Sequence, residues 1–423
     1  MWFQLFNPIS LLLIDIMTTL GKQKILKQIN RKHILNMLRE YDEISIAELS
    51  KKANLSKPTI MKIMKYYIDK GFIVISGKGN STEEGGKKPN IFKFNANGGF
   101  SMGMIITANK LKAVLTNLKS EVVENASVSL NFNEEIESVI DKIVKLYRKL
   151  LEVSGVNSSK LIGLAIGIYG ITDFDNGIVF YSPHYPSWGK NVKMRDMIKK
   201  KITDNVPVLL DNISRFHVFA EKTLGSAKNA SNIISLVAGY GLSCGVIIEN
   251  DIKRGFHKIM GEVGHMIINP SESMVCACGS KGCFEVMVSI ERLKKIIADK
   301  SPDYPGSVFY GISNNSGIAN LEPDDIFKAF NAGDKLAFAA MKEIINWLAI
   351  GLANIILIYD PEVIVLHGAY IRAGDNFLKM LRKKVEQISL TSVKKDTKIE
   401  FSKLGEMAGV LGAATFLINR FFQ

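Results

Sequence analysis

Residues 261–285 read GEVGHMIINPSESMVCACGSKGCFE, the most informative stretch of the chain. The chain has four cysteines, and three of them, Cys276, Cys278 and Cys283, fall within eight residues of this stretch. His265 stands just upstream of them. Three thiolates and one imidazole complete the tetrahedral ligand set of a structural zinc site, whereas a catalytic zinc site keeps one position open. The segment therefore predicts a structural Zn²⁺ ion held by these four side chains.

The composition of the 423-residue chain indicates a globular protein of two or three domains. A hydrophobic fraction of 47% is ample for packed cores, so long disordered stretches are not expected. Clustered cysteines indicate metal binding in a reducing compartment rather than disulfides, and we therefore expect a cytoplasmic protein. Cys244 stands apart in a glycine-rich segment, where it is either a small buried hydrophobe or a reactive thiol.

The first residues, MWFQLFNPISLLLIDIM, are apolar, but the run is too short to cross a membrane and Asp15 interrupts it. It has neither the basic segment nor the small-residue cleavage site of a secretory signal. We expect translation to start at Met17, which makes residues 1–16 an extension of the gene model. An interfacial membrane anchor is the alternative interpretation. No other segment predicts a membrane span, and no membrane partner is expected.

Residues 30–53 have the pattern of two helices joined by a short turn. Apolar side chains recur at helical spacing in the first helix, at Ile34, Leu35, Leu38 and Tyr41. A second, shorter helix fits residues 45–53. Ser45 is its expected N-cap, and Glu48 follows three residues later, which is the signature of a capping box.

A third helix over residues 57–70 completes a helix-turn-helix and is the expected recognition helix. Ser56 precedes it as N-cap, and Pro58 lies in its first turn, where a missing N–H costs nothing. Its apolar face consists of Ile60, Ile63, Met64 and Tyr67. The residues expected to contact DNA from this helix are Ser56, Lys57, Pro58, Thr59, Lys62 and Lys65.

Two strand-like segments after this helix, residues 72–79 and 90–95, flank a polar tip and predict a wing. Glycines free the backbone of the tip, and its lysines can lie along phosphates or enter a minor groove. The residues expected to contact DNA from the wing are Gly85, Gly86, Lys87 and Lys88.

The distribution of charge supports a DNA-binding domain over residues 17–95. The whole chain has 54 basic and 41 acidic residues, a net charge of +13; residues 17–95 hold 16 basic and 7 acidic residues, a net charge of +9. About a fifth of the length thus carries most of the excess, as expected for contact with a polyanion. A solvated helical hairpin with ordinary lysines, or a winged helix used only for protein contacts, would be the alternatives.

From residue 96 onward the pattern changes to strands alternating with helices. Residues 101–130 read as two or three consecutive strands, and further apolar strands are expected at 161–170, 206–212, 232–250 and 361–370. Amphipathic helices lie between them, such as 134–153 and 334–358. The alternation predicts an α/β fold of two similar lobes with a ligand cleft between them. The expected lobes are residues 96–208 together with the C-terminal helix, and residues 209–400.

The chain resembles the ROK family (repressors, open reading frames and kinases), in its repressor branch. The resemblance rests on GGKKP at 85–89, GEVGH at 261–265, CACGSKGC at 276–283 and GEMAGVLGAA at 405–414. The cysteine motif with its upstream GEVGH is the most specific part. Xylose, N-acetylglucosamine and glucose-responsive repressors have a similar arrangement. The resemblance implies an actin-like, ribonuclease H-like sugar-kinase fold behind the winged helix-turn-helix.

The resemblance also assigns functions to residues of this chain. It identifies the zinc ligands as His265, Cys276, Cys278 and Cys283, and it implies sugar contacts from Asn212, Glu262, His265 and Glu285. Carboxylates suit this role because they accept hydrogen bonds from sugar hydroxyls, and a neighbouring metal fixes the loop that orients them. The alternative for the two glutamates is a role as surface carboxylates or helix caps.

Several residues that kinases of the family use for phosphoryl transfer are changed in this chain. Their first-strand Asp-x-Gly-x-Thr corresponds to residues 105–109, which lack both the acid and the glycine, and the loop at 239–245 has lost one glycine. Ile213 falls at the general base, and a shift of one residue would place Asn212 there instead. A larger shift makes Asp211 the base. We expect no catalytic residues.

These features predict a sugar-responsive transcriptional repressor of carbohydrate-utilisation genes. Sugar would favour one arrangement of the lobes and so move the DNA-binding heads. Reading two half-sites of operator DNA implies a homodimer or a dimer of dimers. The choice among xylose, glucose and N-acetylglucosamine depends on pocket shape near residues 169–170, 182–188 and 262–285.

Three alternatives to this prediction remain open. The first is a ROK-type sugar kinase with residual ATP-dependent activity. The second is a DNA-binding protein that does not respond to any ligand. The third is an activator, which would look identical in sequence because polarity depends on the position of the operator.

Overall fold

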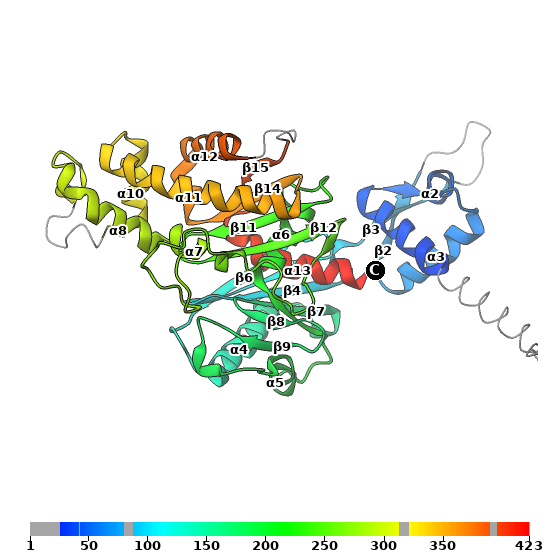
Figure 1. Ribbon diagram of the computed structural model, residues 1–423. Helices are drawn as coiled ribbons and strands as arrows, with labels where there is room; N and C mark the ends of the chain where they lie inside the picture. The colour runs from blue at the N-terminus through cyan, green and yellow to red at the C-terminus, as the bar shows by residue number, and fades with distance from the viewer. Residues whose placement is uncertain (1–25, 42, 80–87, 313–320, 390–395, 423) are drawn as a thin grey trace, which may run out of the picture.

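The computed structural model describes residues 26–41, 43–79, 88–312, 321–389 and 396–422. It consists of a small N-terminal head and a larger body that contains two separate five-stranded sheets (Figure 1). The expectation for residues 1–16 and that for the wing residues Gly85, Gly86 and Lys87 lie outside the described residues.

The head is a winged helix-turn-helix, as predicted. A helix over residues 26–40 is followed by β1 (Ile44–Ser45), α2 (Ile46–Ala53), α3 (Lys57–Asp69), β2 (Ile73–Lys78) and β3 (Asn90–Phe94). β3 lies between β1 and β2 and pairs antiparallel with both. The head lies at one end of the body, where the C-terminal helix also ends (Figure 1).

Local capping signals determine where the head helices begin. The Oγ of Ser45 accepts a hydrogen bond from the Glu48 N–H, and the Glu48 carboxylate accepts one from the Ser45 N–H at 2.9 Å. Ser56 caps α3 by accepting from the Thr59 N–H, and Pro58 lies in its first turn. Both predicted helix starts are therefore confirmed.

The first helix packs an apolar face into the head, with one difference from the prediction. Three of the four apolar side chains at helical spacing are buried, and so is Met37, but Tyr41 is 38% exposed. The helix ends at residue 40, so Tyr41 lies beyond its apolar face. The Tyr41 ring instead lies 4.8 Å from the ammonium group of Lys52.

The first lobe of the body contains a sheet of order β10-β7-β4-β5-β6. Its strands are β4 (Phe100–Ile106), β5 (Lys110–Asn117), β6 (Val122–Ser129), β7 (Leu161–Ile168) and β10 (Val208–Asn212). One face packs against α4 (Ile136–Ser154) and α5 (Met194–Lys201), and a small hairpin of β8 (Ile171–Asp173) and β9 (Ile178–Tyr181) follows β7. All of β10 pairs with β7, so the change of lobe comes after Asn212 rather than after residue 208.

The second lobe contains a sheet of order β13-β12-β11-β14-β15. Its strands are β11 (Ile233–Ala238), β12 (Leu242–Ile248), β13 (Asp251–Ile252), β14 (Val363–Gly368) and β15 (Lys398–Phe401). Its helices are α7 (Phe284–Met287), α8 (Ile290–Lys300), α9 (Phe309–Ile312), α10 (Pro323–Asn331), α11 (Lys335–Tyr359) and α12 (Gly374–Ile388). The two lobes thus repeat one plan, a mixed five-stranded sheet with helices, as the alternating pattern predicted.

Helices α6 (Ile213–Thr223) and α13 (Ala408–Phe421) lie between the two sheets (Figure 1). α13 packs on β4, β5 and β7 of the first lobe, and α6 packs on α13 and on β11 and β12 of the second. Glycine allows a very close approach, because a Cβ at Gly412 would lie 1.9 Å from the carbonyl oxygen of Phe216. The two helices form one tightly packed pair.

α11 forms the centre of the second lobe. Among the described helices it is the one long and apolar enough to cross a membrane, but half of its most apolar window is buried inside the protein. A helix buried in a domain core has this composition. At Gly351 an added Cβ would meet the ring of Phe284 at 2.1 Å, so this ring packs directly against the backbone of α11.

Candidate functional site

The four predicted metal ligands come together on one loop of the second lobe. One ligand atom from each of His265, Cys276, Cys278 and Cys283 lies within 4.8 Å of the others. Cys276 Sγ is 3.6 Å from His265 Nδ1, and Cys278 Sγ is 3.6 Å from Cys283 Sγ. Zn–S bonds of about 2.3 Å in a tetrahedron place neighbouring sulfurs about 3.8 Å apart. The donor set therefore fits a tetrahedral zinc ion.

Tight backbone turns bring these thiols together. The Gly279 N–H donates to the Cys276 carbonyl at 2.8 Å, and Gly279 has a φ of +89°, which favours glycine. Partial burial raises the pKa of Cys278, but hydrogen bonds from the Ser280 backbone and the neighbouring thiols outweigh it and bring the pKa to about 7. The exposed thiol of this loop is thus readily converted to the thiolate that binds metal.

Glu262 and Glu285 lie beside this metal-ligand loop. Burial raises the pKa of Glu262; the charges of His265 and Arg215 lower it, and that of Glu285 raises it further. A Cβ added at Gly264 would lie 3.4 Å from the Cβ of Glu285, so the turn that contains Glu262 and His265 packs against Glu285. Glu285 also accepts a hydrogen bond from the Leu242 N–H at 2.8 Å. Three of the four predicted sugar-binding residues are therefore clustered.

Asn212, the fourth predicted sugar-binding residue, is the N-cap of α6. Its Oδ1 accepts from the Ser214 N–H at 2.8 Å, and its Nδ2 donates to the Gly170 carbonyl at 2.7 Å. The amide group keeps one further N–H for a ligand. Arg215 lies on the first turn of the same helix, and its charge reaches Glu262. Asn212 is thus next to the clustered residues, but its side chain is already hydrogen-bonded to the backbone at Ser214 and Gly170.

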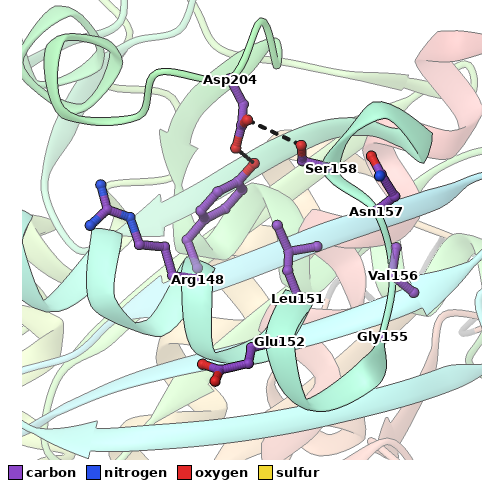
Figure 2. A pocket seen from close by; sticks show the side chains of 9 residues that line it. Arg148, Leu151, Glu152, Gly155, Val156, Asn157, Ser158 and Asp204 are labelled. Carbon is purple, nitrogen blue, oxygen red and sulfur yellow. Dashed lines mark hydrogen bonds between the residues drawn. The ribbon is translucent and has the colours of Figure 1, made fainter.

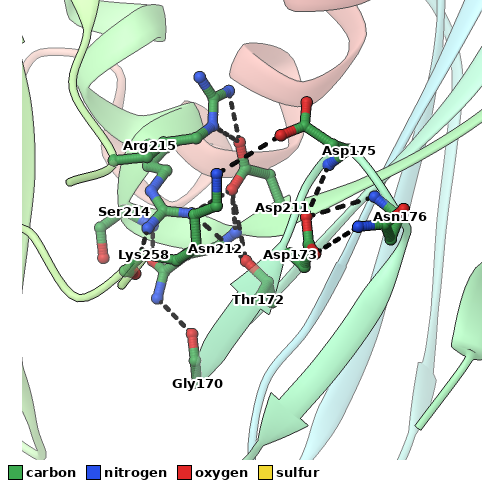
Figure 3. Close-up of polar contacts among 11 residues, drawn as sticks. Gly170, Thr172, Asp173, Asp175, Asn176, Asp211, Asn212, Ser214, Arg215 and Lys258 are labelled. Atoms are coloured by element: carbon green, nitrogen blue, oxygen red, sulfur yellow. Dashed lines mark hydrogen bonds and ion pairs between the residues drawn. The ribbon is translucent and has the colours of Figure 1, made fainter. Parts of the chain in front are cut away.

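Asp211 is the centre of a polar network (Figure 3). Its side chain is fully buried, and its Oδ2 accepts from Arg254 Nη2 at 2.7 Å while its Oδ1 accepts from Arg215 Nη1 at 2.5 Å. Arg215 also donates to the Lys258 carbonyl at 2.7 Å. Both carboxylate oxygens are therefore engaged by guanidinium groups, in charge-assisted hydrogen bonds.

Ile105 and Ile213, which the resemblance aligned with an acid and a base of the kinases, are packed as core. Ile105 and Ile213 are buried in the same apolar cluster, together with Val410 of α13. An aliphatic side chain can neither hold Mg²⁺ nor accept a proton. These two side chains contribute apolar packing at this position.

His184 was missed as an individual residue, although the segment 182–188 was expected to shape the pocket. Its ring packs edge-on against Tyr169, with centroids 5.4 Å apart. Burial lowers the pKa of His184, and the charge of Glu285 opposes this effect. His184 follows β9 in the first lobe, whereas Glu285 belongs to α7 of the second. The signal in the sequence that could have identified this residue was a single histidine within the segment 182–188.

A surface hollow of about 450 Å³ lies elsewhere, at the C-terminal end of α4 (Figure 2). Asp204 accepts hydrogen bonds from the hydroxyl groups of Tyr147, at 2.8 Å, and Ser158, at 3.1 Å. These polar groups satisfy one another, and none of the predicted sugar-binding residues lines the hollow. It is separate from the candidate site.

The predicted DNA-contacting residues of α3 lie on its outer side. Ser56, Lys57, Pro58, Lys62 and Lys65 are exposed, and Thr59 is half-buried with its hydroxyl 2.9 Å from that of Ser56. Lys88 is exposed at the start of the wing's second strand. The exposed lysines leave α3 with a basic outer surface, which suits contact with phosphates.

Comparison with known proteins identifies both parts of the chain. Residues 101–420 match the model of the ROK family, and residues 27–74 match that of a winged helix-turn-helix DNA-binding domain. The chain is 29% identical over 400 residues to the xylose repressor of Caldicellulosiruptor bescii, covering 95% of this chain and 98% of that protein. It is 30% identical over 321 residues to the glucokinase of Thermotoga maritima, covering 76% of this chain and 94% of that protein.

A solved structure agrees with the fold. The crystal structure of a ROK family transcriptional regulator, a homologue of the E. coli MLC protein, has a TM-score of 0.79 at 22% identity. The match covers 94% of this chain and 97% of that one. The predicted fold, a winged helix-turn-helix joined to an actin-like body of two lobes, is confirmed.

Proposed function

Because the chain belongs to the ROK family, we propose that it is a sugar-responsive transcriptional repressor whose head binds operator DNA and whose body binds the sugar. One observation carries the proposal: Glu262 and Glu285 are kept beside the metal-ligand loop in a chain whose alignment with a xylose repressor spans 95% of its length, head included. Sugar would bind one arrangement of the lobes more tightly and so shift the population of DNA-binding states.

We propose that the sugar contacts come from Asn212, Glu262, His265 and Glu285, with His184 facing them from the first lobe. Two carboxylates and an imidazole present several acceptors to the hydroxyls of a monosaccharide. A site of this kind rejects analogues that lack a hydroxyl, because its buried polar groups would be left unpaired. The xylose repressor among the relatives makes D-xylose the first candidate.

Zinc is proposed as a structural ion bound by His265, Cys276, Cys278 and Cys283. When bound, it supplies no reaction chemistry but fixes the loop between Glu262 and Glu285. His265 uses Nδ1 toward Cys276, which leaves Nε2 for a sugar hydroxyl. A side chain with both roles would couple metal content to sugar affinity.

The proposed DNA contacts are the outer residues of α3 and the wing. They are Ser56, Lys57, Pro58, Thr59, Lys62, Lys65, Gly85, Gly86, Lys87 and Lys88. Two such heads reading half-sites about one turn of DNA apart imply a homodimer or a dimer of dimers. We propose a cytoplasmic protein that regulates genes of carbohydrate use.

The experiment that tests the proposed function combines a thermal-shift screen with DNA binding. D-xylose, D-glucose and N-acetylglucosamine are each titrated against the full chain, and duplexes that the protein selects from a random pool serve as the DNA probe. A repressor of this kind gains thermal stability with one sugar and releases the selected duplex with the same sugar. Stabilisation by no sugar would favour a DNA-binding protein that does not respond to ligand.

A sugar kinase is the second candidate, favoured by the 30% identity to a glucokinase. Against it stand the apolar packing of Ile213 and Ile105 and the two guanidinium groups on Asp211. We expect no ATP-dependent phosphorylation of D-xylose or D-glucose in a coupled assay of ADP release. Turnover that is absent from a Glu262→Ala control preparation would establish the kinase instead.

A further inference from the structure

The aromatic side chains at the end of α13 pack into the core of the head. Phe422 lies against Phe72 with ring centroids 5.5 Å apart and against Phe94 at 6.4 Å, and Phe421 lies against Phe72 at 5.6 Å. Arg39 of the first head helix lies over the Phe422 ring at 5.8 Å. The head core is therefore completed by residues that belong to a helix of the body.

The other end of α13 lies deep in the body (Figure 1). A Cβ at Gly409 would lie 2.7 Å from Nε2 of His217, and one at Gly412 would lie 1.9 Å from the carbonyl oxygen of Phe216, so α13 is in close contact with α6 over this turn. Ser101 of β4 donates to the Ala414 carbonyl at 2.8 Å. Any movement of α6 against the first lobe must move α13 or break these contacts.

α6 in turn begins at the proposed sugar site. Asn212 is its N-cap, and Arg215 on its first turn holds the carbonyl of Lys258, in the segment that leads to Glu262. The charge of Arg215 also reaches Glu262 itself. One continuous path of packed side chains and hydrogen bonds thus runs from the sugar site along α6 and α13 into the head.

α13 is long enough for a small tilt at one end to produce a large displacement at the other. A helix of 14 residues is about 21 Å long. If one end tilts by about 10°, the other moves by roughly 4 Å, which is close to the rise of about 3.4 Å between successive base pairs. Leu118 of the β5–β6 turn and Ile162 of β7 also contact the head core. These contacts hold one side of the head against the first lobe. A displacement of the end of α13 on the other side would therefore rotate the head.

We propose that Phe422, supported by Phe421, is the positioning residue through which sugar binding in the body changes the orientation of the DNA-binding head. This inference rests on the proposed function and specifies its regulation. Phe422 touches neither sugar nor DNA. It acts because its ring joins α13 to Phe72 and Phe94, the residues at either end of the β2–β3 wing.

The test compares wild type, Phe422→Ala and the control Phe132→Ala, which removes an aromatic ring that is 70% exposed between β6 and α4. For each full-length protein the Kd for the selected duplex is measured without sugar, with saturating D-xylose and with saturating D-glucose, and the Kd for each sugar is measured by calorimetry. We expect the effective sugar to raise the DNA Kd of wild type and Phe132→Ala by about tenfold or more. In Phe422→Ala the ratio of the DNA Kd with sugar to the DNA Kd without sugar should fall to within about twofold of unity, while the Kd for the sugar stays at the wild-type value.

If the effect of sugar on DNA binding is lost while the affinity for sugar and the affinity for DNA are both retained, the cause is neither a damaged sugar site nor an unfolded head. If Phe422→Ala no longer binds DNA even without sugar, Phe422→Leu takes its place, because leucine keeps an apolar contact but removes the ring. A ratio equal to that of wild type in the variant that still binds DNA overturns the inference. If neither sugar changes DNA binding by wild type, the proposed function itself is wrong, and the inference is rejected with it.

Discussion

The carboxylate of Glu285 accepts a hydrogen bond from the backbone N–H of Leu242 at 2.8 Å. This bond joins the metal-ligand loop to the glycine-rich loop at 239–245. A sugar that engages Glu285 must share this carboxylate with Leu242 or displace it. If sugar binds Glu285, the change in this hydrogen bond would therefore be the first effect on the rest of the second lobe.

Glu285→Ala should weaken D-xylose binding by roughly tenfold to a hundredfold, because a hydrogen bond to a charged group contributes about 1.5–3 kcal/mol. Operator binding without sugar should be unchanged, so the variant represses but does not respond. Calorimetry with D-xylose and DNA titration check the two parts. Glu291→Ala, on the exposed side of α8, is the matched control. Equal sugar affinity in both variants would exclude Glu285 from the site.

Cys278→Ser should lower the zinc content measured by mass spectrometry and also the thermal stability, because the loop loses one of four ligands. The control is Cys244→Ala. Cys244 is buried in β12, and burial raises its pKa far above the usual thiol value, so it should behave as a core hydrophobe. Wild-type zinc content in Cys278→Ser would rule out the proposed ligand set.

Lys62→Ala and Lys88→Ala should each weaken binding to the selected duplex and reduce the slope of log K against log salt by about 1. Each lysine is exposed on the proposed DNA face, one on α3 and one on the wing. Lys149→Ala, on the exposed side of α4, changes the net charge equally but should leave the slope alone. Identical slopes for all three variants would place the DNA face elsewhere.

The stacked pair His217 and His367 should make stability fall in acid. Their rings are 5.0 Å apart, and burial lowers the pKa of His217 to about 4. The unfolded chain, with a histidine pKa of about 6.5, binds more protons than the native state, so stability is present above about pH 6.5 and is lost as pH falls toward 4. His217 alone would contribute roughly 3 kcal/mol over this range. The raised pKa of Glu221, beside His367, opposes part of the loss.

Denaturant unfolding at several pH values checks this prediction. In His217→Gln the dependence of stability on pH should be flatter between about pH 6.5 and 4, because one buried site no longer excludes a proton. His257→Gln is the control, since His257 is exposed. A slope unchanged by the substitution at His217 would show that other groups dominate the acid transition.

Features that depend on local spacing could be predicted from the sequence. The capping box of Ser45 and Glu48 and the cap at Ser56 involve residues three apart, and the structure has them. Three of the four proposed metal ligands lie within one tight loop, so their spacing alone indicated the cluster that the structure shows. The sequence pattern also predicted two similar lobes, because hydrophobic periodicity reports each strand and helix separately.

Features that depend on contacts between distant segments could not be predicted. Asp211 pairs with Arg254, 43 residues away, and nothing in either segment indicates the other. The same holds for Phe422, which meets Phe72 and Phe94 from the far end of the chain. The lobe boundary was placed too early because β10 pairs with β7. The hydrophobic pattern of a strand indicates the strand itself but not its partner in the sheet.

The contact between Gly351 and Phe284 has a genetic consequence. Phe284 stands between Cys283 and Glu285, and its ring occupies the space where any side chain at position 351 would lie. A substitution there would push on Phe284 and thereby displace a proposed metal ligand, Cys283, and a proposed sugar ligand, Glu285, at once. Selections for cells that can no longer be induced should therefore yield alleles at codon 351.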